Sequence, residues 1–261
     1  MRCGAMKALS ASILALILGS LTGTAAGTTN AAGGVYSLRV VEAKTPRIRW
    51  SCRTTGITVS GRYPQVFHKG VPLTDVNAAL HAAALADERS LIAGGCPPGG
   101  RNGVPGPAIY ETDPQLPLMS ASSVVVSALM HAGSIPPGAN FSYDWAAVTI
   151  RVATARQISI ADLFERPDQG LKAVAAAARA RLFARNVCVR QYPNTSGFEP
   201  KISNYRYFAL TTKGLAIGFS AGAVAPRICG YFLVTLPFAR VRPYLGKIGR
   251  ELVAGVRPPL N

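Results

Sequence analysis

The stretch ISNYRYFALTTKGLAIGF, residues 202–219, decides the fold of this chain. It contains two runs rich in apolar residues, Ile202–Thr211 and Leu215–Phe219, joined by Thr212–Gly214. Strand-like runs joined by a short segment that contains glycine are typical of a β-hairpin. The spacing therefore predicts two antiparallel strands here, and residues 228–236 predict a third strand after them.

Further strands and helices are predicted before and after this hairpin. Strand-like runs occur at residues 35–44, 57–67, 122–130 and 143–152. Helical spacing of apolar residues predicts helices at residues 72–92, 170–187 and 238–253, the last interrupted near Pro243. Strands outnumber helices and do not alternate strictly with them, which favours an α+β fold over a doubly wound sheet.

The N-terminus has the pattern of a secretory signal peptide. Arg2 and Lys7 precede an uncharged apolar run over residues 8–22, and small residues follow at 23–26. This order matches the basic, apolar and cleavage regions of a signal peptide. We expect residues 1–26 to be removed and the mature protein to be secreted, either extracellular or cell-wall associated. An uncleaved anchor is the alternative, but the run is shorter than the ~20 residues that cross a bilayer.

The remainder of the chain is long enough for one domain with a substantial core. We expect a linker and an N-terminal strand at residues 27–54, followed by a single secreted domain at residues 55–255. A Gly- and Pro-rich loop interrupts that domain at residues 94–107. Residues 256–261 form a tail that we expect to fray.

Four cysteines follow the expected leader: Cys52, Cys96, Cys188 and Cys229. An even number of cysteines in an exported protein predicts two disulfides, and three pairings are possible. We favour Cys52 with Cys96 and Cys188 with Cys229, because each pair closes a loop within one half of the chain. Each such loop closure contributes about 4 kcal/mol in the chain-entropy account. Buried free thiols are the alternative.

Positive charge is concentrated in the second half of the chain. Without Arg2 and Lys7, 26 basic residues face 12 acidic ones, a net charge of +14. Residues 27–145 contain nine basic and seven acidic residues, whereas residues 146–261 contain seventeen and five. For an exported protein this charge favours anionic wall polymers, anionic lipid headgroups or acidic proteins as partners rather than nucleic acid. The Arg- and Ala-rich composition fits a GC-rich bacterial genome equally well.

The helix predicted at residues 170–187 is amphipathic and basic on its exposed side. Four arginines in and just after it form the candidate binding surface: Arg179, Arg181, Arg185 and Arg190. Like charges four residues apart on a helix destabilise it, so an anionic partner that neutralises them would be favoured. A solvated helix face without a partner is the alternative.

One motif favours an enzyme. Residues 218–222 spell Gly-Phe-Ser-Ala-Gly, the G-x-S-x-G pattern of the nucleophile elbow in α/β-hydrolases. However, residues 223–230 contain Pro226 and lead into another strand rather than a helix, and no histidine follows Ser220. His131 could approach Ser220 from earlier in the chain. A structural loop is the favoured interpretation, and a cell-wall-associated serine esterase that uses Ser220 and His131 is the alternative.

Other chemical motifs are weaker still. No C-x-x-C spacing occurs, and the histidines are scattered, so we expect no metal site and no cofactor. Tyr205 and Tyr207 are expected on one face of a strand, where they could stack on a sugar. Packing of the two rings against the basic helix is the alternative.

Two sequence blocks resemble a known family. Tyr143, Asp144 and Trp145, with ISIADLF at residues 158–164, resemble the "YDW … ITxxDLF" stretch of the secreted mycobacterial immunogenic antigen family. A second block resembles its "NFxLTxDGLxFxF…APxxxGxxxVxIPxxxL" pattern, with matches at Asn204, Tyr205, Phe208, Ala209, Leu210, Thr211, Gly214, Leu215, Phe219, Ala225, Pro226, Gly230, Val234, Pro237 and Tyr244. Residues 63–66 resemble the entry strand of that family, so the resemblance spans about 59–252.

The same domain of unknown function forms the extracellular part of lysozyme-sensing anti-sigma factors and accompanies some peptidoglycan deacetylases. The resemblance implies an α+β fold with a mixed, largely antiparallel sheet flanked by helices, and a domain that recognises rather than catalyses. We do not extend lysozyme binding to this chain, because lysozyme is basic and a chain with a net charge of +14 repels it. Since only seven residues precede the apolar run, we do not expect transcriptional signalling either.

We therefore expect a secreted, non-enzymatic recognition domain of the bacterial envelope. Its basic C-terminal half would bind an anionic envelope polymer or an acidic protein. Nucleic acid is not an expected partner, peripheral contact with a membrane is compatible with the charge, and the oligomeric state stays open.

Overall fold

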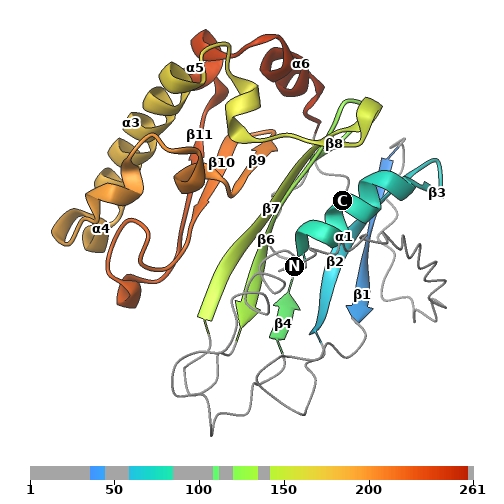
Figure 1. The fold of residues 1–261 in the computed structure, drawn as a ribbon, viewed down its shortest axis with the longest axis horizontal. Helices are drawn as coiled ribbons and strands as arrows, with labels where there is room; N and C mark the ends of the chain where they lie inside the picture. Colours follow the sequence, from blue (N-terminus) through green and yellow to red (C-terminus); the bar gives the residue numbers. More distant parts are fainter. Residues whose placement is uncertain (1–35, 45–58, 85–107, 112–119, 135–141, 258–261) are drawn as a thin grey trace, which may run out of the picture.

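The computed structural model describes residues 36–44, 59–84, 108–111, 120–134 and 142–257. The expected leader, Cys52, Cys96 and the Gly- and Pro-rich loop lie outside these residues. The described elements pack in layers (Figure 1): one helix, a large sheet, a small sheet and then a group of helices. The α+β class expected from the sequence is confirmed.

The large sheet has the strand order β1-β2-β4-β6-β7-β8, with β3 beside β2 and β5 beside β6. Only β2 and β4 pair in parallel, so the sheet is mixed and largely antiparallel, as the resemblance implied. Its strands are β1 Tyr36–Lys44, β2 Val59–His68, β3 Val71–Pro72, β4 Ala108–Glu111, β5 Ser120–Ala121, β6 Val125–Ser134, β7 Ser142–Arg151 and β8 Arg156–Gln157.

Helix α1, Thr74–Ala84, covers one face of the large sheet. Its Val76 and Leu80 are buried in an apolar cluster with residues of β2, β6 and β7. Asn77 lies in the same interface, where its amide accepts from Val66 N at 2.7 Å and donates to Val66 O at 3.0 Å. This pair of bonds satisfies a buried polar side chain and attaches the helix to β2. The helix predicted at residues 72–92 begins at Thr74 instead, because Pro72 pairs with β2 in β3, and it is described as far as Ala84.

The small sheet is the predicted hairpin and third strand: β9 Phe208–Thr211, β10 Gly214–Phe219 and β11 Phe232–Leu236, in the order β11-β10-β9. Two boundaries predicted from the sequence were wrong. Residues 202–205 form a 3-10 turn, η4, instead of extending β9, because the ring of Tyr205 turns into the core. Residues 227–229 form another 3-10 turn, η5, and Gly230 with a φ of +79° follows it before β11 begins.

A group of helices covers the outer face of the small sheet. The long helix predicted at residues 170–187 begins earlier, at Pro167, because proline suits the first position of a helix. The predicted C-terminal helix is broken around Pro243, as expected. The helices and turns of this group are η2 Ile160–Leu163, α3 Pro167–Arg185, α4 Val187–Gln191, η3 Thr195–Phe198, α5 Phe238–Val241, η6 Arg242–Tyr244 and α6 Lys247–Gly255.

The two sheets meet where β6 and β7 pack on β9 and β10. A buried polar group lies in this interface: Ser127 Oγ accepts from Leu210 N at 2.8 Å and hydrogen-bonds Thr149 Oγ1 at 2.7 Å. Because Leu210 lies in β9, the hydroxyl of Ser127 satisfies a backbone amide at the edge of the small sheet. The large sheet therefore closes that edge.

Trp145 of β7 fixes how closely the sheets approach each other. Its side chain is 1% exposed, and its indole Nε1 donates to Phe219 O at 3.2 Å. The indole lies directly over Gly218 of β10, where an added Cβ would stand 2.6 Å from Trp145 Cγ. Glycine is therefore required at residue 218 for close approach.

A disulfide ties the helical group to the small sheet. Cys188 in α4 and Cys229 in η5 are bonded, which confirms the pairing favoured from the sequence. The pair closes a loop of 41 residues, and such a closure contributes about 4 kcal/mol in the chain-entropy account. The second predicted disulfide, Cys52 with Cys96, lies outside the described residues and stays a prediction.

We expect Gly218→Ala to destabilise the protein by about 1–3 kcal/mol, since overpacking a buried contact has that cost. The same substitution in a Trp145→Leu background should cost much less, because the smaller side chain leaves room for the added methyl group. Chemical denaturation of the four proteins of this double-mutant cycle measures the coupling. An equal cost in both backgrounds would show that the indole is not the obstacle.

Candidate functional site

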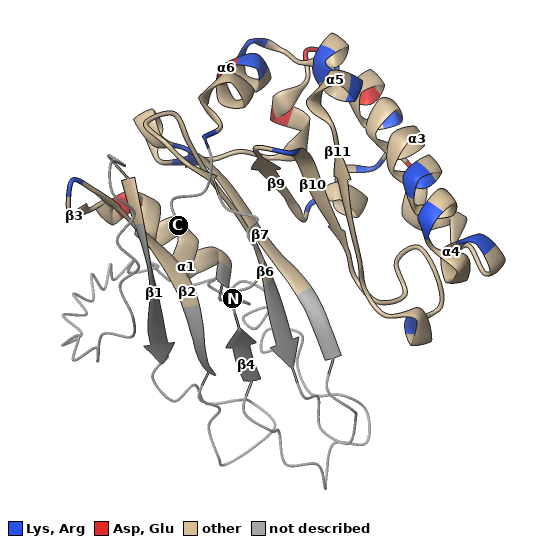
Figure 2. Ribbon diagram, turned by 180° about the vertical axis from the view of Figure 1, so that it is seen from behind, with Lys and Arg blue, Asp and Glu red and all other residues tan. Residues whose placement is uncertain are grey.

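The helical group presents many cations and few anions. Figure 2 shows Lys and Arg along α3, α4, α5 and α6. Residues 200–250, which include the whole small sheet, contain eight basic residues and no acidic one. The excess of positive charge expected for the second half of the chain thus lies on the small sheet and its helices.

Three of the five carboxylates in residues 146–261 are already paired with cations. Arg151 and Glu251 form a two-bond ion pair, at 3.0 and 2.8 Å. The other two pairs are Arg156 with Asp162 at 3.3 Å, and Lys201 with Glu199 at 2.5 Å. These pairs leave Glu165 and Asp168, at the start of α3, as the remaining acidic residues of this half.

The four candidate arginines surround the C-terminal part of α3 instead of forming one flat face. Arg179 and Arg181 are two residues apart, which turns the helix by about 200°. The guanidinium of Arg179 lies 5.1 Å from the ring centroid of Phe183, whereas Arg181 is half-buried on the opposite flank. Arg185 ends the helix, and Asn186 then caps α4 by accepting from Val189 N. Arg190 is exposed on α4.

None of these four arginines forms an ion pair with a carboxylate in the part of the chain that the structure describes. Asp168 stands eleven residues before Arg179, or about 16 Å along the helix axis, which exceeds the screening length at physiological salt. Arg185 also gains from the partial negative charge at the end of α3. Arg190 lies in the same way in the last turn of α4, and Arg179 faces the ring of Phe183.

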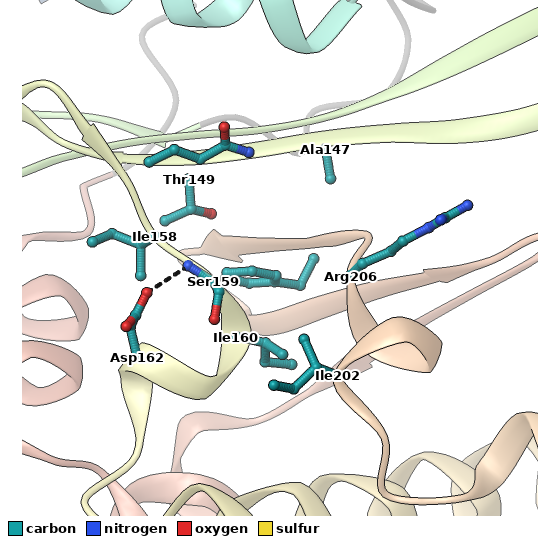
Figure 3. A pocket seen from close by; sticks show the side chains of 10 residues that line it. Ala147, Thr149, Ile158, Ser159, Ile160, Asp162, Ile202 and Arg206 are labelled. Carbon is teal, nitrogen blue, oxygen red and sulfur yellow. Dashed lines mark hydrogen bonds between the residues drawn. The ribbon is translucent and has the colours of Figure 1, made fainter. Parts of the chain in front are cut away.

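A cleft of about 340 Å³ opens between the two sheets (Figure 3). Its lining comes from β7 and β8 of the large sheet, the segment that leads into η2, η2 itself, η4 and β9. The residues that line it are Ala147, Thr149, Gln157, Ile158, Ser159, Ile160, Asp162, Ile202, Arg206 and Phe208.

Four of the polar residues that line this cleft, Thr149, Ser159, Asp162 and Arg206, are engaged with neighbouring residues. Asp162 accepts from Ser159 N at 2.8 Å, in a capping box that begins η2, as Figure 3 shows. Thr149 is bonded to Ser127. The guanidinium of Arg206 lies 4.4 Å from the ring centroid of Tyr207 and also bonds its hydroxyl. No histidine or cysteine is among the residues that line this cleft.

The surroundings of Ser220 account for the G-x-S-x-G pattern without catalysis. Gly218 leaves room for Trp145, as described above. Ala223 N donates to Ser220 O at 3.0 Å, which closes a four-residue turn, and Gly222 has a φ of +91° at its third position. A type II turn needs this positive φ. The turn leads through η5 into β11, and not into the helix that a nucleophile elbow requires.

His131 lies in β6, where it is paired in register with Trp145. Trp145 contacts Gly218 and Phe219 and therefore lies beside the segment that leads to Ser220. The side chain of His131 lies outside the described residues, so its relation to Ser220 stays untested. The serine esterase stays an alternative for experiment.

The suggested pair of sugar-stacking tyrosines was wrong for Tyr205. Its ring is 0% exposed, and its hydroxyl donates to Phe198 O at 3.0 Å. Burial raises the pKa of the Tyr205 phenol well above its ordinary value, so the group stays a neutral donor. Tyr207 is half-buried and holds Arg206 against its ring, instead of sharing a face with Tyr205.

The described residues contain no group of three or more His, Cys, Asp or Glu side chains that could hold a metal ion. Among the helices of the same residues, none is both long and apolar enough to cross a membrane.

No family model matches this sequence, and the search of curated proteins finds no match. Solved structures show the fold. A member of the DUF3298 family from Bacteroides fragilis superposes with a TM-score of 0.52 at 10% identity, covering 85% of this chain and 97% of that one. A DUF3298 family protein from Pseudomonas aeruginosa has a TM-score of 0.51 at 12% identity, covering 82% of this chain and 94% of that one.

These structures agree with the expected domain of unknown function, at the level of the fold. They do not support the more specific resemblance to the mycobacterial antigen family. At identities of 10% and 12%, they carry no information on which residues of this chain bind a partner.

We expect Ser220→Ala to leave any hydrolysis of short acyl esters unchanged, because the serine lies in a turn and not in an elbow. Ser203→Ala, another serine on the surface of the same half, is the matched control. Activity of the purified variants is measured alongside their circular dichroism spectra. A loss of roughly 100-fold or more in a folded Ser220→Ala protein, but not in the control, would identify Ser220 as the nucleophile.

Proposed function

We propose that this protein is a non-enzymatic recognition domain that binds an anionic polymer of the bacterial envelope through the arginines at the end of α3 and in α4. The observation that supports this proposal is that Arg181, Arg185 and Arg190 lack ion-pair partners within the described residues, whereas Arg151 and Arg156 have them. Unpaired cations that gather at one end of a helix repel each other. A polyanion bound there relieves the repulsion.

The form of this surface suits a polymer better than a small molecule. The arginines surround a convex helix end, and small-molecule ligands prefer concave, largely apolar pockets. A flexible chain of negative charges can follow the curve of α3 and α4 and contact each guanidinium in turn. An acidic protein is the alternative partner, and the binding experiments distinguish it from a polymer.

We further propose that the domain acts outside the cytoplasm and is related to the secreted antigen family. The apolar leader supports export, because it precedes small residues of the kind that a signal peptidase accepts. The disulfide between Cys188 and Cys229 also fits an oxidising compartment.

Export predicts a mature protein that begins between Ala26 and Gly33 and is recovered from the culture supernatant. Intact mass analysis of the secreted protein gives the cleavage site, and comparison of the masses with and without alkylation gives the number of free thiols. Recovery of only the full-length chain in membranes would contradict export, and any alkylated thiol would contradict the second disulfide.

Replacing Arg181, Arg185 and Arg190 by Gln should weaken binding to a purified anionic wall fraction by about 100-fold at low salt, at roughly 1 kcal/mol for each contact. Binding of the unmodified protein should fall steeply as salt rises, because exposed charges are screened. Sedimentation with the insoluble wall fraction measures both effects.

A control variant removes the same charge elsewhere. Lys69, Lys213 and Arg257 are exposed on other elements and are replaced by Gln together. If this control loses as much affinity as the helix variant, net charge alone accounts for binding. If binding is undetectable, or persists equally in high salt, the basic helix end has no partner of this kind.

A further inference from the structure

We infer that the outer edge of β11 is a strand-addition site, which pairs with an extended segment of a protein partner that carries carboxylates at its ends. This inference goes beyond the proposed function, because it uses the edge of the small sheet and not the end of α3. It rests on the hydrogen-bond directions of β11, its exposed apolar side chains and the charge around it.

The backbone direction of β11 follows from its partner strand. Gly218 N donates to Tyr207 O at 2.8 Å, so the polar backbone groups of Gly218 face β9. In antiparallel strands successive residues alternate in direction, so Ile217 and Phe219 face β11. Their register partners are Val234 and Phe232, which therefore bond inward.

The alternation leaves Leu233 and Thr235 of β11 with N–H and C=O groups that point away from β10. No described strand pairs with β11 on that side. No backbone bond to either residue from another described element fills these positions. The edge thus presents two donors and two acceptors in the spacing that a further strand would match.

The side chains at this edge are apolar and exposed. Leu233 is 36% exposed and Tyr231 is 44% exposed, and in η5, just before the strand, Ile228 is 95% exposed. The ring of Tyr231 lies edge-on to Trp145, with 5.4 Å between the centroids, so this apolar surface continues into the contact between the sheets. Exposed aliphatic and aromatic side chains beside an open edge are the usual setting of strand addition.

Proteins normally protect such an edge. Charged residues, proline, bulges or a covering element prevent unwanted pairing. The opposite edge of the same sheet is protected in this way, since Ser127 of β6 accepts from Leu210 N of β9. By contrast, β11 contains neither a charged residue nor a proline in its five residues, FLVTL. One edge of the small sheet is therefore bonded to β6, whereas the other edge, β11, lacks the charged residues and prolines that prevent strand pairing.

The charges near β11 indicate which kind of segment pairs with it. Arg227 precedes β11, and Arg240 and Arg242 follow it, whereas residues 200–250 contain no acidic residue. A second copy of this chain would bring the same cations to the same edge and be repelled. A segment with an apolar, β-prone centre and carboxylates at both ends matches the backbone groups and the exposed side chains of this edge, and its charge is opposite to that of the sequence around β11.

The probe is a synthetic peptide with alternating Val and Thr at its centre and two Asp residues at each end. One control peptide has Lys in place of Asp, and the other has proline at two central positions, which removes backbone donors. We expect the Asp-ended peptide to bind the mature protein and to slow hydrogen exchange of the amides of Leu233 and Thr235. Both control peptides should bind at least tenfold more weakly.

Leu233→Pro removes an outward-pointing backbone N–H without removing a hydrogen bond to β10. It should therefore weaken binding of the Asp-ended peptide at least tenfold. Leu233→Asp, which places a negative charge on the edge, is a second variant in case the first does not fold. Thr154→Asp, at an exposed turn between β7 and β8 of the large sheet, makes the same charge change away from β11 and should retain binding within about twofold.

The outcomes separate this inference from the proposed function. Leu233→Pro should keep its affinity for the wall fraction, and the protein with Arg181, Arg185 and Arg190 replaced by Gln should keep its affinity for the peptide. The inference is overturned if no peptide binds, if the proline-containing peptide binds equally well, or if the amides of β11 are protected without peptide in a concentration-dependent dimer.

Discussion

The structure depends on the contact between Trp145 and Gly218. An indole buried between two sheets needs a partner strand without a Cβ at that position, and β10 supplies one. The contact brings β6 and β7 over β9 and β10, and the same approach places Ser127 within reach of Leu210 N. One edge of the small sheet is therefore closed by the large sheet, whereas no described strand pairs with its other edge, β11.

Local pattern was sufficient to predict most elements of the second half of the chain. The hairpin around Thr212–Gly214, the long helix and the break near Pro243 follow from turn chemistry and helical spacing, which operate within a few residues. The pairing of Cys188 with Cys229 was also favoured from the sequence, because closing a local loop is the least costly choice in chain entropy. The long strands β1, β2, β6 and β7 were predicted with boundaries displaced by a few residues, whereas the short strands β3, β4 and β5 were not predicted.

Features that depend on distant residues could not be predicted. Tyr205 has the alternation of a strand residue, but its ring packs edge-on against Phe219, and burying it requires a 3-10 turn. The four arginines are neighbours in sequence, yet the pitch of α3 separates Arg179 from Arg181. Gly218 belongs to a sequence pattern that indicates a catalytic serine. The structure gives a different reason for a glycine at this position, because the ring of Trp145 leaves no room for a Cβ.

The two edges of the small sheet show how a stable fold can still leave a site for recognition. At the β9 edge, the buried hydroxyl of Ser127 hydrogen-bonds both Leu210 N and Thr149 Oγ1. This edge therefore contributes to folding and cannot bind a partner strand there. The inner face of β11 is packed against the core through Phe232, Val234 and Leu236, which holds the strand in place, and no described strand pairs with its outer edge. A strand fixed on one side and open on the other loses little conformational freedom when it binds, so more of the interaction energy remains for affinity.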